Sequence, residues 1–162
     1  MALEIERKFL VKQPPAWFEL LPHKEIIQWY LSDPSTGKSI RVRKIGDEYK
    51  VTRKKWHGLV REEIEVTIPK EEFDQLWFQV ENHFLEKTRY YIPYEWLTIE
   101  LDVYKNLQNL KTAEVEFKTK RDAKKFITPE RFWEELTTIR EASNAYIAKH
   151  WLDGELLTLL QG

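Results

Sequence analysis

The sequence lacks cysteine entirely, and it has only five glycines and one methionine in 162 residues. Without cysteine the protein has no disulfides and no thiol chemistry, which is compatible with a reducing cytosol. No apolar run approaches the roughly 20 residues that span a membrane, and the first residues are acidic where a signal peptide is basic. We therefore expect a cytoplasmic protein without a membrane partner.

An excess of charge of one sign is also lacking. The 26 basic and 27 acidic side chains give a formal net charge of −1, so the overall balance does not predict a nucleic-acid-binding or membrane-surface protein. Charged residues nevertheless make up 33% of the chain, which is above the usual share. Recognition of an anion must therefore depend on a local cluster of basic residues.

No low-complexity stretch, repeat or Gly/Ser/Pro-rich linker divides the chain. Its 42% of hydrophobic residues can bury a substantial core without disulfides or a structural metal. We expect residues 1–162 to form a single domain.

Eight segments have the alternation and the β-branched or aromatic content of strands. They lie near residues 2–11, 24–32, 38–46, 48–55, 61–68, 84–93, 97–105 and 112–119. Short separators at 33–37, 45–48 and 56–58, the last containing His57 as a turn residue, predict hairpins and hence antiparallel neighbours. Eight antiparallel strands predict a closed or nearly closed barrel, because closure removes unpaired edges.

Helical patterns flank these strands. Pro69 opens a segment with acidic residues in the first turn and with Phe73, Leu76, Trp77 and Val80 at helical spacing. Residues 129–136 begin with a proline and predict a second helix, and residues from 138 predict a longer one that Gly154 ends. The fold class is mainly β (α+β), with helices around the strands.

Seven of the strands carry charged side chains on one face. Counted in register, these are Glu4, Glu6, Lys8, Arg41, Arg43, Lys50, Lys54, Arg61, Glu63, Glu65, Lys87, Arg89, Glu100, Asp102, Glu114, Glu116 and Lys118. In one arrangement these faces point to water and the apolar faces form the core. In the other, helices cover the apolar faces from outside and the charges line the lumen of a wide barrel.

Like charges two residues apart favour the lumen. Such pairs repel, and a protein gains from them only when a partner of opposite charge arrives. Paired carboxylates suit hard cations such as Mg²⁺ and Mn²⁺, while arginine and lysine bind phosphate oxygens. A lumen that holds both types is suited to a metal-bound polyphosphate.

The motif E-I-E-R-K at 4–8 resembles the E-x-E-x-K signature of the CYTH superfamily, the triphosphate tunnel metalloenzymes. The motifs I-R-V-R, V-T-R-K, R-E-E-I-E, E-K-T-R-Y, I-E-L-D-V-Y and A-E-V-E-F follow in the family's order over about residues 2–118. The sequence is most similar to small bacterial members that act as inorganic triphosphatases. The resemblance implies an eight-stranded antiparallel β-barrel tunnel with helices outside.

The resemblance also implies a role for each charged position. As metal ligands it implies Glu4, Glu6, Glu114 and Glu116, with Glu63, Glu65 and Asp102 for a second ion or its waters. As triphosphate-binding residues it implies Lys8, Arg41, Arg43, Lys54, Arg61, Lys87 and Arg89. Of these, we expect Glu4, Glu6, Lys8, Lys87 and Arg89 to be catalytic. Only their position on the charged strand faces supports Glu100, Lys50 and Lys118 as lumen residues, and we assign them no role beyond balancing charge.

The C-terminal helix adds two candidates to the tunnel mouth. Arg140, as a substrate-binding residue, and Asn144 lie four residues apart and can share one helix face that reaches inward. A surface arginine near a helix start fits the same pattern.

The reaction implied is hydrolysis of a triphosphate, foremost inorganic triphosphate, to pyrophosphate and phosphate with one or two Mg²⁺ or Mn²⁺ ions. A class IV adenylate cyclase and a nucleoside or thiamine triphosphatase are alternatives within the family. A non-enzymatic alternative is a module that binds polyphosphate without hydrolysing it. The expected partner is the small triphosphate itself, and both a monomer and a homodimer fit.

Overall fold

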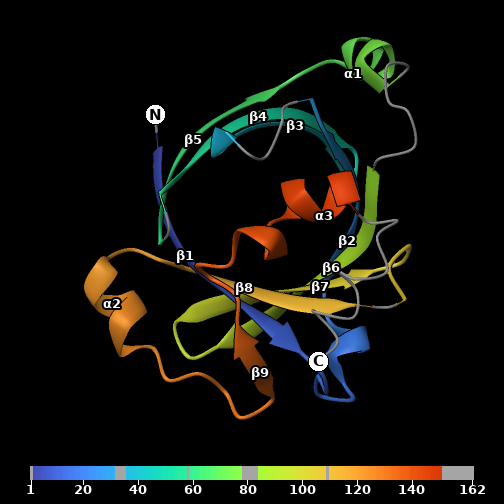
Figure 1. Cartoon of the computed structure of the whole chain (residues 1–162). Helices are drawn as coiled ribbons and strands as arrows, with labels where there is room; N and C mark the ends of the chain where they lie inside the picture. Colours follow the sequence, from blue (N-terminus) through green and yellow to red (C-terminus); the bar gives the residue numbers. More distant parts are fainter. Residues whose placement is uncertain (1, 32–35, 58, 78–83, 109, 151–162) are drawn as a thin grey trace.

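The computed structural model describes residues 2–31, 36–57, 59–77, 84–108 and 110–150, although not the side chains of residues 56, 57 and 133 (Figure 1). The strands in this part of the chain are β1 (Ala2–Val11), β2 (His23–Tyr30), β3 (Lys38–Ile45), β4 (Glu48–His57), β5 (Val60–Thr67), β6 (Phe84–Tyr94), β7 (Leu97–Tyr104), β8 (Lys111–Phe117) and β9 (Phe132–Glu135). The helices are η1 (Phe18–Leu20), α1 (Lys70–Trp77), α2 (Lys120–Lys125), η3 (Arg140–Ala142) and α3 (Asn144–His150).

The first eight strands form a closed antiparallel barrel. Hydrogen-bonded neighbours follow the order β5-β4-β3-β2-β6-β7-β8-β1, and β1 then pairs with β5 to close the ring. Residues 2–5 of β1 make this closing pairing, whereas β9 pairs with the far end of β1. The predicted eight-stranded antiparallel barrel is therefore confirmed, and β9 is a short additional strand.

The apolar faces of the strands point out of the barrel. Trp29 of β2 and Val42 of β3 pack under Phe73 of α1, while Phe9 of β1 belongs to a cluster that includes Ala123 of α2. Burial of apolar area contributes about 25 cal/mol per Å², so these outer layers supply much of the driving force for the fold. In Figure 1, α1 and α2 lie outside the ring of strands.

The charged faces consequently point into the lumen. Cross-strand partners share a face, and the register sets Glu6 opposite Glu116, Lys54 opposite Glu63 and Arg89 opposite Asp102. Of the two arrangements that the sequence allows, the structure has the one with an ionic lumen.

The C-terminal helix lies at the mouth of the lumen, which is one of the two positions that the sequence allows for it. Figure 1 shows α3 within the ring of strands. Ile147 and Ala148 of α3 share an apolar cluster with Leu10, Leu85 and Tyr104, which lie on the inward faces of β1, β6 and β7. Because the inward faces become apolar at this end, α3 caps the lumen there instead of covering the outer wall.

Residues 129–136 do not form the predicted helix. Phe132–Glu135 is a strand whose pairing with β1 continues into a hydrogen bond from the Leu136 amide to the Lys8 carbonyl, at 2.7 Å. The helix was predicted from Pro129 and the acidic residues after it, and this prediction was wrong. Residues 132–135 form a strand because the far end of β1 has an unpaired edge, which local sequence does not reveal.

The predicted helix from residue 138 is broken at Ser143. Its backbone is extended (φ −70°, ψ 145°), and its hydroxyl accepts a hydrogen bond from the Tyr146 amide at 3.2 Å, which separates η3 from α3. The short helix α2 was not predicted, although its T-K-R-D start is a capping pattern, and the Thr119 side chain accepts from the Asp122 amide there. Val80 and Gly154 lie outside the described residues.

No helix within the described residues has the length and apolar character needed to cross a membrane.

Candidate active site in the barrel lumen

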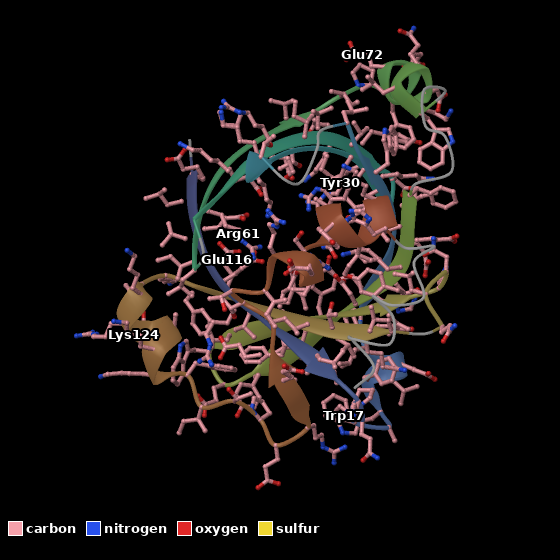
Figure 2. The ribbon with its side chains drawn as sticks, viewed as in Figure 1. Trp17, Tyr30, Arg61, Glu72, Glu116 and Lys124 are labelled. Carbon is pink, nitrogen blue, oxygen red and sulfur yellow. The ribbon has the colours of Figure 1, made fainter. Side chains whose placement is uncertain are left out.

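Two cavities occupy the lumen and share Glu6, Arg41, Lys54 and Glu114 in their walls. The basic cavity lies at the α3 end, and its charged lining is completed by Lys8, Lys38, Arg61 and Arg140. The acidic cavity is also lined by Glu4, Glu63, Glu100, Glu116, Arg43 and Arg89. Figure 2 shows Tyr30, Arg61 and Glu116 inside the ring of strands, and Trp17, Glu72 and Lys124 outside it.

Glu4 and Glu63, the open acid pair, border the acidic cavity and share one lysine. The Lys54 ammonium lies 2.7 Å from Glu4 Oε2 and 2.8 Å from Glu63 Oε2. Burial raises the pKa of Glu4 to about 7, against the pull of Lys54 and with help from the charge of Glu63. Burial acts on Glu63 too, but the Lys54 charge outweighs it and the pKa of Glu63 is lowered. Two carboxylates that compete for one cation leave room for another cation.

Lys87, Arg89 and Asp102 form a second group, the closed ion cluster. Arg89 donates to both oxygens of Asp102 at 2.7 and 2.8 Å, and the Lys87 ammonium donates to the same carboxylate. Burial opposes ionisation of Asp102, yet the two cations outweigh it and lower its pKa. Burial lowers the pKa of Lys87 to about 8 in spite of the Asp102 charge. Neither Lys87 nor Asp102 lines either cavity.

Glu114 connects the two cavities. Its carboxylate accepts from Arg89 at 2.9 Å and lies 3.4 Å from the Lys8 ammonium. Burial alone would raise its pKa, but Lys8 and Arg89 hold the pKa of Glu114 well below its usual range. Glu114 is therefore ionised at neutral pH and keeps two bases directed at the lumen.

Glu65 is surrounded by donors and lines neither cavity. It accepts from Thr52 at 2.9 Å and from Arg43 at 3.1 Å, and the Lys50 ammonium lies at 3.2 Å. These contacts hold Arg43 against the wall, from where it borders the acidic cavity.

Carboxylates face one another across strands beside the acidic cavity. Glu6 lies opposite Glu116, and Glu100 opposite Glu114, although Glu6 also pairs with Arg61 and Glu100 with Arg89. Directly opposed like charges are destabilising unless an oppositely charged group lies between them. Glu116 is exposed, so this end of the cavity is open to solvent.

The structure thus brings most of the predicted residues to the cavities and leaves some apart. Glu65, Asp102, Lys87, Lys50 and Lys118 line neither cavity, whereas Arg140 is exposed and still lines the basic cavity. His57 ends β4 instead of lying in a turn, and its side chain is outside the described set.

Tyr30 is a lumen residue that sequence reasoning missed. It lies opposite Arg41 in the β2–β3 pairing and lines the basic cavity, where its hydroxyl accepts from the Gln28 amide at 3.0 Å. Burial raises its pKa, so the phenol is neutral. The signal lay in the hairpin register, since the residue opposite an inward arginine also points inward.

The acidic cavity has the donor set that a hard divalent cation prefers. Its carboxylates from β1, β5 and β8 are Glu4, Glu6, Glu63, Glu114 and Glu116. Burial, with a smaller contribution from Glu63, raises the pKa of Glu4 among them. Among the described residues no three acidic or histidine side chains already converge on one point, because lysine and arginine hold these carboxylates. The residues fit a metal that exchanges places with these cations.

Known proteins resemble the chain over most of its length. An inorganic triphosphatase from Nitrosomonas europaea is 39% identical over 149 residues, which are 90% of this chain and 96% of that protein. A crystal structure of an inorganic triphosphatase superposes with a TM-score of 0.67 at 36% identity, covering 91% of this chain and 95% of the other.

A candidate adenylate cyclase from Bacillus halodurans shares the fold at 21% identity and a TM-score of 0.58, over 76% of this chain and 86% of that chain. The CYTH domain family matches residues 2–150. This match and the 39% identity show that the chain belongs to the CYTH domain family.

Proposed function

We propose that this protein hydrolyses inorganic triphosphate to pyrophosphate and phosphate. The proposal rests on one observation: carboxylates and basic side chains line the same lumen. Four residues, Glu6, Arg41, Lys54 and Glu114, line both of its cavities. The inorganic triphosphatase from Nitrosomonas europaea supports the choice of substrate. A module that only binds polyphosphate would need the bases and not the acids.

The bases are the proposed substrate-binding residues. Lys8, Arg41, Lys54, Arg61 and Arg140 border the basic cavity, and Arg43 and Arg89 border the acidic one. Guanidinium and ammonium groups make charge-assisted hydrogen bonds to phosphate oxygens, and these bonds are about twice as strong as neutral ones. Several such groups around one lumen can hold all three phosphates of a short chain.

The carboxylates are the proposed metal ligands. Triphosphatases of this family are metalloenzymes, and we propose one or two Mg²⁺ or Mn²⁺ ions held by Glu4, Glu6, Glu63, Glu114 and Glu116. Such an ion supplies a Lewis acid that offsets charge on phosphate oxygens. Glu65 and Asp102, which the sequence also predicts as ligands, are held by bases away from both cavities, and we propose that they keep those bases in place.

Hydrolysis needs a water oxygen to bond to the terminal phosphorus as the bridging P–O bond breaks and pyrophosphate leaves with the bond electrons. One proton of the water passes to a phosphate oxygen of the products. Lys8 and Arg89, held by Glu114, offset the charge that grows on the leaving group. Glu4 and Glu6 complete the proposed catalytic set with Lys87. Lys87 lines neither cavity, and its proposed part is to hold the Asp102 carboxylate, which in turn holds Arg89.

The decisive experiment is a substrate panel. Phosphate release is measured from triphosphate, pyrophosphate, ATP and thiamine triphosphate with Mg²⁺ or Mn²⁺ and with a chelator, and cyclic AMP is measured alongside. We expect phosphate from triphosphate, no turnover with the chelator, and no cyclic AMP. Tight triphosphate binding without turnover under either metal would instead identify a binding module.

An organic triphosphate is the second candidate substrate. Leu136 and Ile139 give the basic cavity an apolar wall beside its charged one, and such a wall could hold a nucleoside or thiamine group. Faster turnover of ATP or thiamine triphosphate in the panel would establish this reading. The single domain, the cytoplasmic location, the lack of nucleic-acid and membrane partners, and the choice between monomer and homodimer stay predictions.

A further inference from the structure

Asn144 joins the capping helix to the lysine of the E-x-E-x-K motif. It is the first residue of α3 and lines the basic cavity. Its side-chain oxygen accepts a hydrogen bond from the Lys8 ammonium at 3.3 Å and another from the Tyr104 hydroxyl. Tyr104 is fully buried on β7, so this oxygen is fixed from two sides.

The chemistry of lysine determines which way the Asn144 amide faces. An ammonium group only donates hydrogen bonds, so the atom of Asn144 that contacts Lys8 must be the carbonyl oxygen. The NH₂ group is then the other end of the amide. Within the described residues no acceptor bonds this group, and its two N–H donors remain for a ligand in the cavity that Asn144 borders.

We propose that Asn144 is a substrate-contacting residue whose NH₂ group donates to a phosphate oxygen of triphosphate while its oxygen orients Lys8. This inference rests on the proposed function and adds the capping helix to it. Tyr104 is a positioning residue, because its hydroxyl acts on the substrate only through Asn144. Its ring also lies 5.3 Å from the Lys87 ammonium, so one side chain supports two lysines of the site.

Asn144→Asp and Asn144→Ala test the two ends of the amide. The aspartate keeps an acceptor for Lys8 and Tyr104 but replaces the NH₂ donors with a negative charge that repels phosphate. The alanine removes both ends. Because hydrogen bonds to charged groups are stronger than those between neutral groups, we expect KM for triphosphate to rise at least about tenfold in both variants, and more in Asn144→Asp. We expect kcat to stay within about threefold.

Asn106→Ala is the matched control. The Asn106 side chain also makes two hydrogen bonds, from the Glu86 amide at 3.1 Å and to the Phe84 carbonyl at 3.0 Å, and it lines neither cavity. We expect this variant to lose thermal stability with an unchanged KM. A purely structural role for Asn144 would give the same result, a lower Tm with wild-type KM, and would overturn the inference.

Tyr104→Phe keeps the inference falsifiable where the Asn144 variants do not fold. It keeps the ring and removes only the hydroxyl, so we expect KM to rise severalfold, and an unchanged KM would overturn the inference. Calorimetric binding of a non-hydrolysable imidotriphosphate, compared between the wild type and Asn144→Asp, separates this inference from the proposed function. Weaker binding by the variant supports the Asn144 contact even if the wild type turns over another triphosphate, and equal binding contradicts it.

Discussion

The closed ion cluster and the open acid pair both set carboxylates against lysine in the same barrel, yet their carboxylates respond differently to burial. In the closed ion cluster two cations serve the single carboxylate of Asp102, and its pKa falls. In the open acid pair two carboxylates share Lys54, and the pKa of Glu4 rises to about 7. Burial opposes ionisation of both carboxylates. At Asp102 the charges of Lys87 and Arg89 outweigh it, whereas at Glu4 the one lysine that is shared with Glu63 does not, so Glu4 can accept a proton or, as proposed, a metal.

The largest expected effect lies on the acidic side of this comparison. Glu4→Ala and Glu116→Ala should each abolish turnover of triphosphate with Mg²⁺ or Mn²⁺, by at least about a thousandfold, because each removes a proposed metal ligand. Both should fold normally, since each lies where carboxylates are in surplus. Steady-state phosphate release and circular dichroism measure the two halves of this prediction. Near wild-type activity in both variants would remove the metal assignment.

Removing the carboxylate of the closed ion cluster should act mainly on stability. Asp102→Asn leaves Lys87 and Arg89 buried with one fewer anion, and breaking a buried pair typically costs about 3–5 kcal/mol. Urea unfolding measures the loss. The double variant Asp102→Asn with Lys87→Met should recover part of it, because it removes the stranded ammonium. If Asp102→Asn is as stable as the wild type, the cluster does not have the structural role assigned to it.

The pH dependence of stability should show that ionisation of Glu4 in the open acid pair destabilises the fold, whereas the ionised Asp102 of the closed ion cluster stabilises it. Because the pKa of Glu4 is raised from 4.5 to about 7, the folded protein holds this proton more tightly than the unfolded chain does. The stability that the proton contributes is therefore lost as pH rises through this window. Glu4→Gln cannot ionise, so in metal-free buffer its Tm should exceed that of the wild type at about pH 8 and match it at about pH 4. A constant difference between the two proteins at all pH values would contradict the assignment.

The smallest effect is expected at an ion pair outside the barrel. Lys70 and Asp74 pair on the exposed surface of α1, where water screens both charges. Lys70→Ala should leave both Tm and turnover unchanged within measurement error. Lys70→Ala is the control for the variants of the closed ion cluster and the open acid pair. A clear loss of Tm would show that exposed ion pairs also stabilise this protein.

The barrel was predictable because its signal repeats along every strand. Alternation placed Glu4, Glu6 and Lys8 on one face, and the like-charge pairs favoured a lumen over solvent. The roles within the lumen were less predictable. Asp102 and Glu4 look alike in sequence, and only the packing of Lys87 and Arg89 around the first carboxylate tells them apart.

The errors lie where a distant partner overrides local pattern. Phe132–Glu135 became a strand because β1 has a free edge there. The helix at α3, by contrast, lies at the lumen mouth, as one of its two expected positions had it, because Leu10 and Leu85 make this end apolar. Tyr30 and the bonding of Asn144 were missed because neither residue is charged, and the search followed charge. Hairpin register is the cue that would have found Tyr30.

The pairing of β1 also has a consequence for how the protein assembles. This strand is bonded to β5, β8 and β9, and it carries Glu4, Glu6 and Lys8. It precedes its partner β8 by about a hundred residues of chain, and contacts so distant in sequence form slowly. On the ribosome β1 therefore has to wait for the eighth strand to emerge. The charged residues of β1 can therefore meet Glu114 and Glu116 of β8 only after nearly the whole barrel has been synthesised.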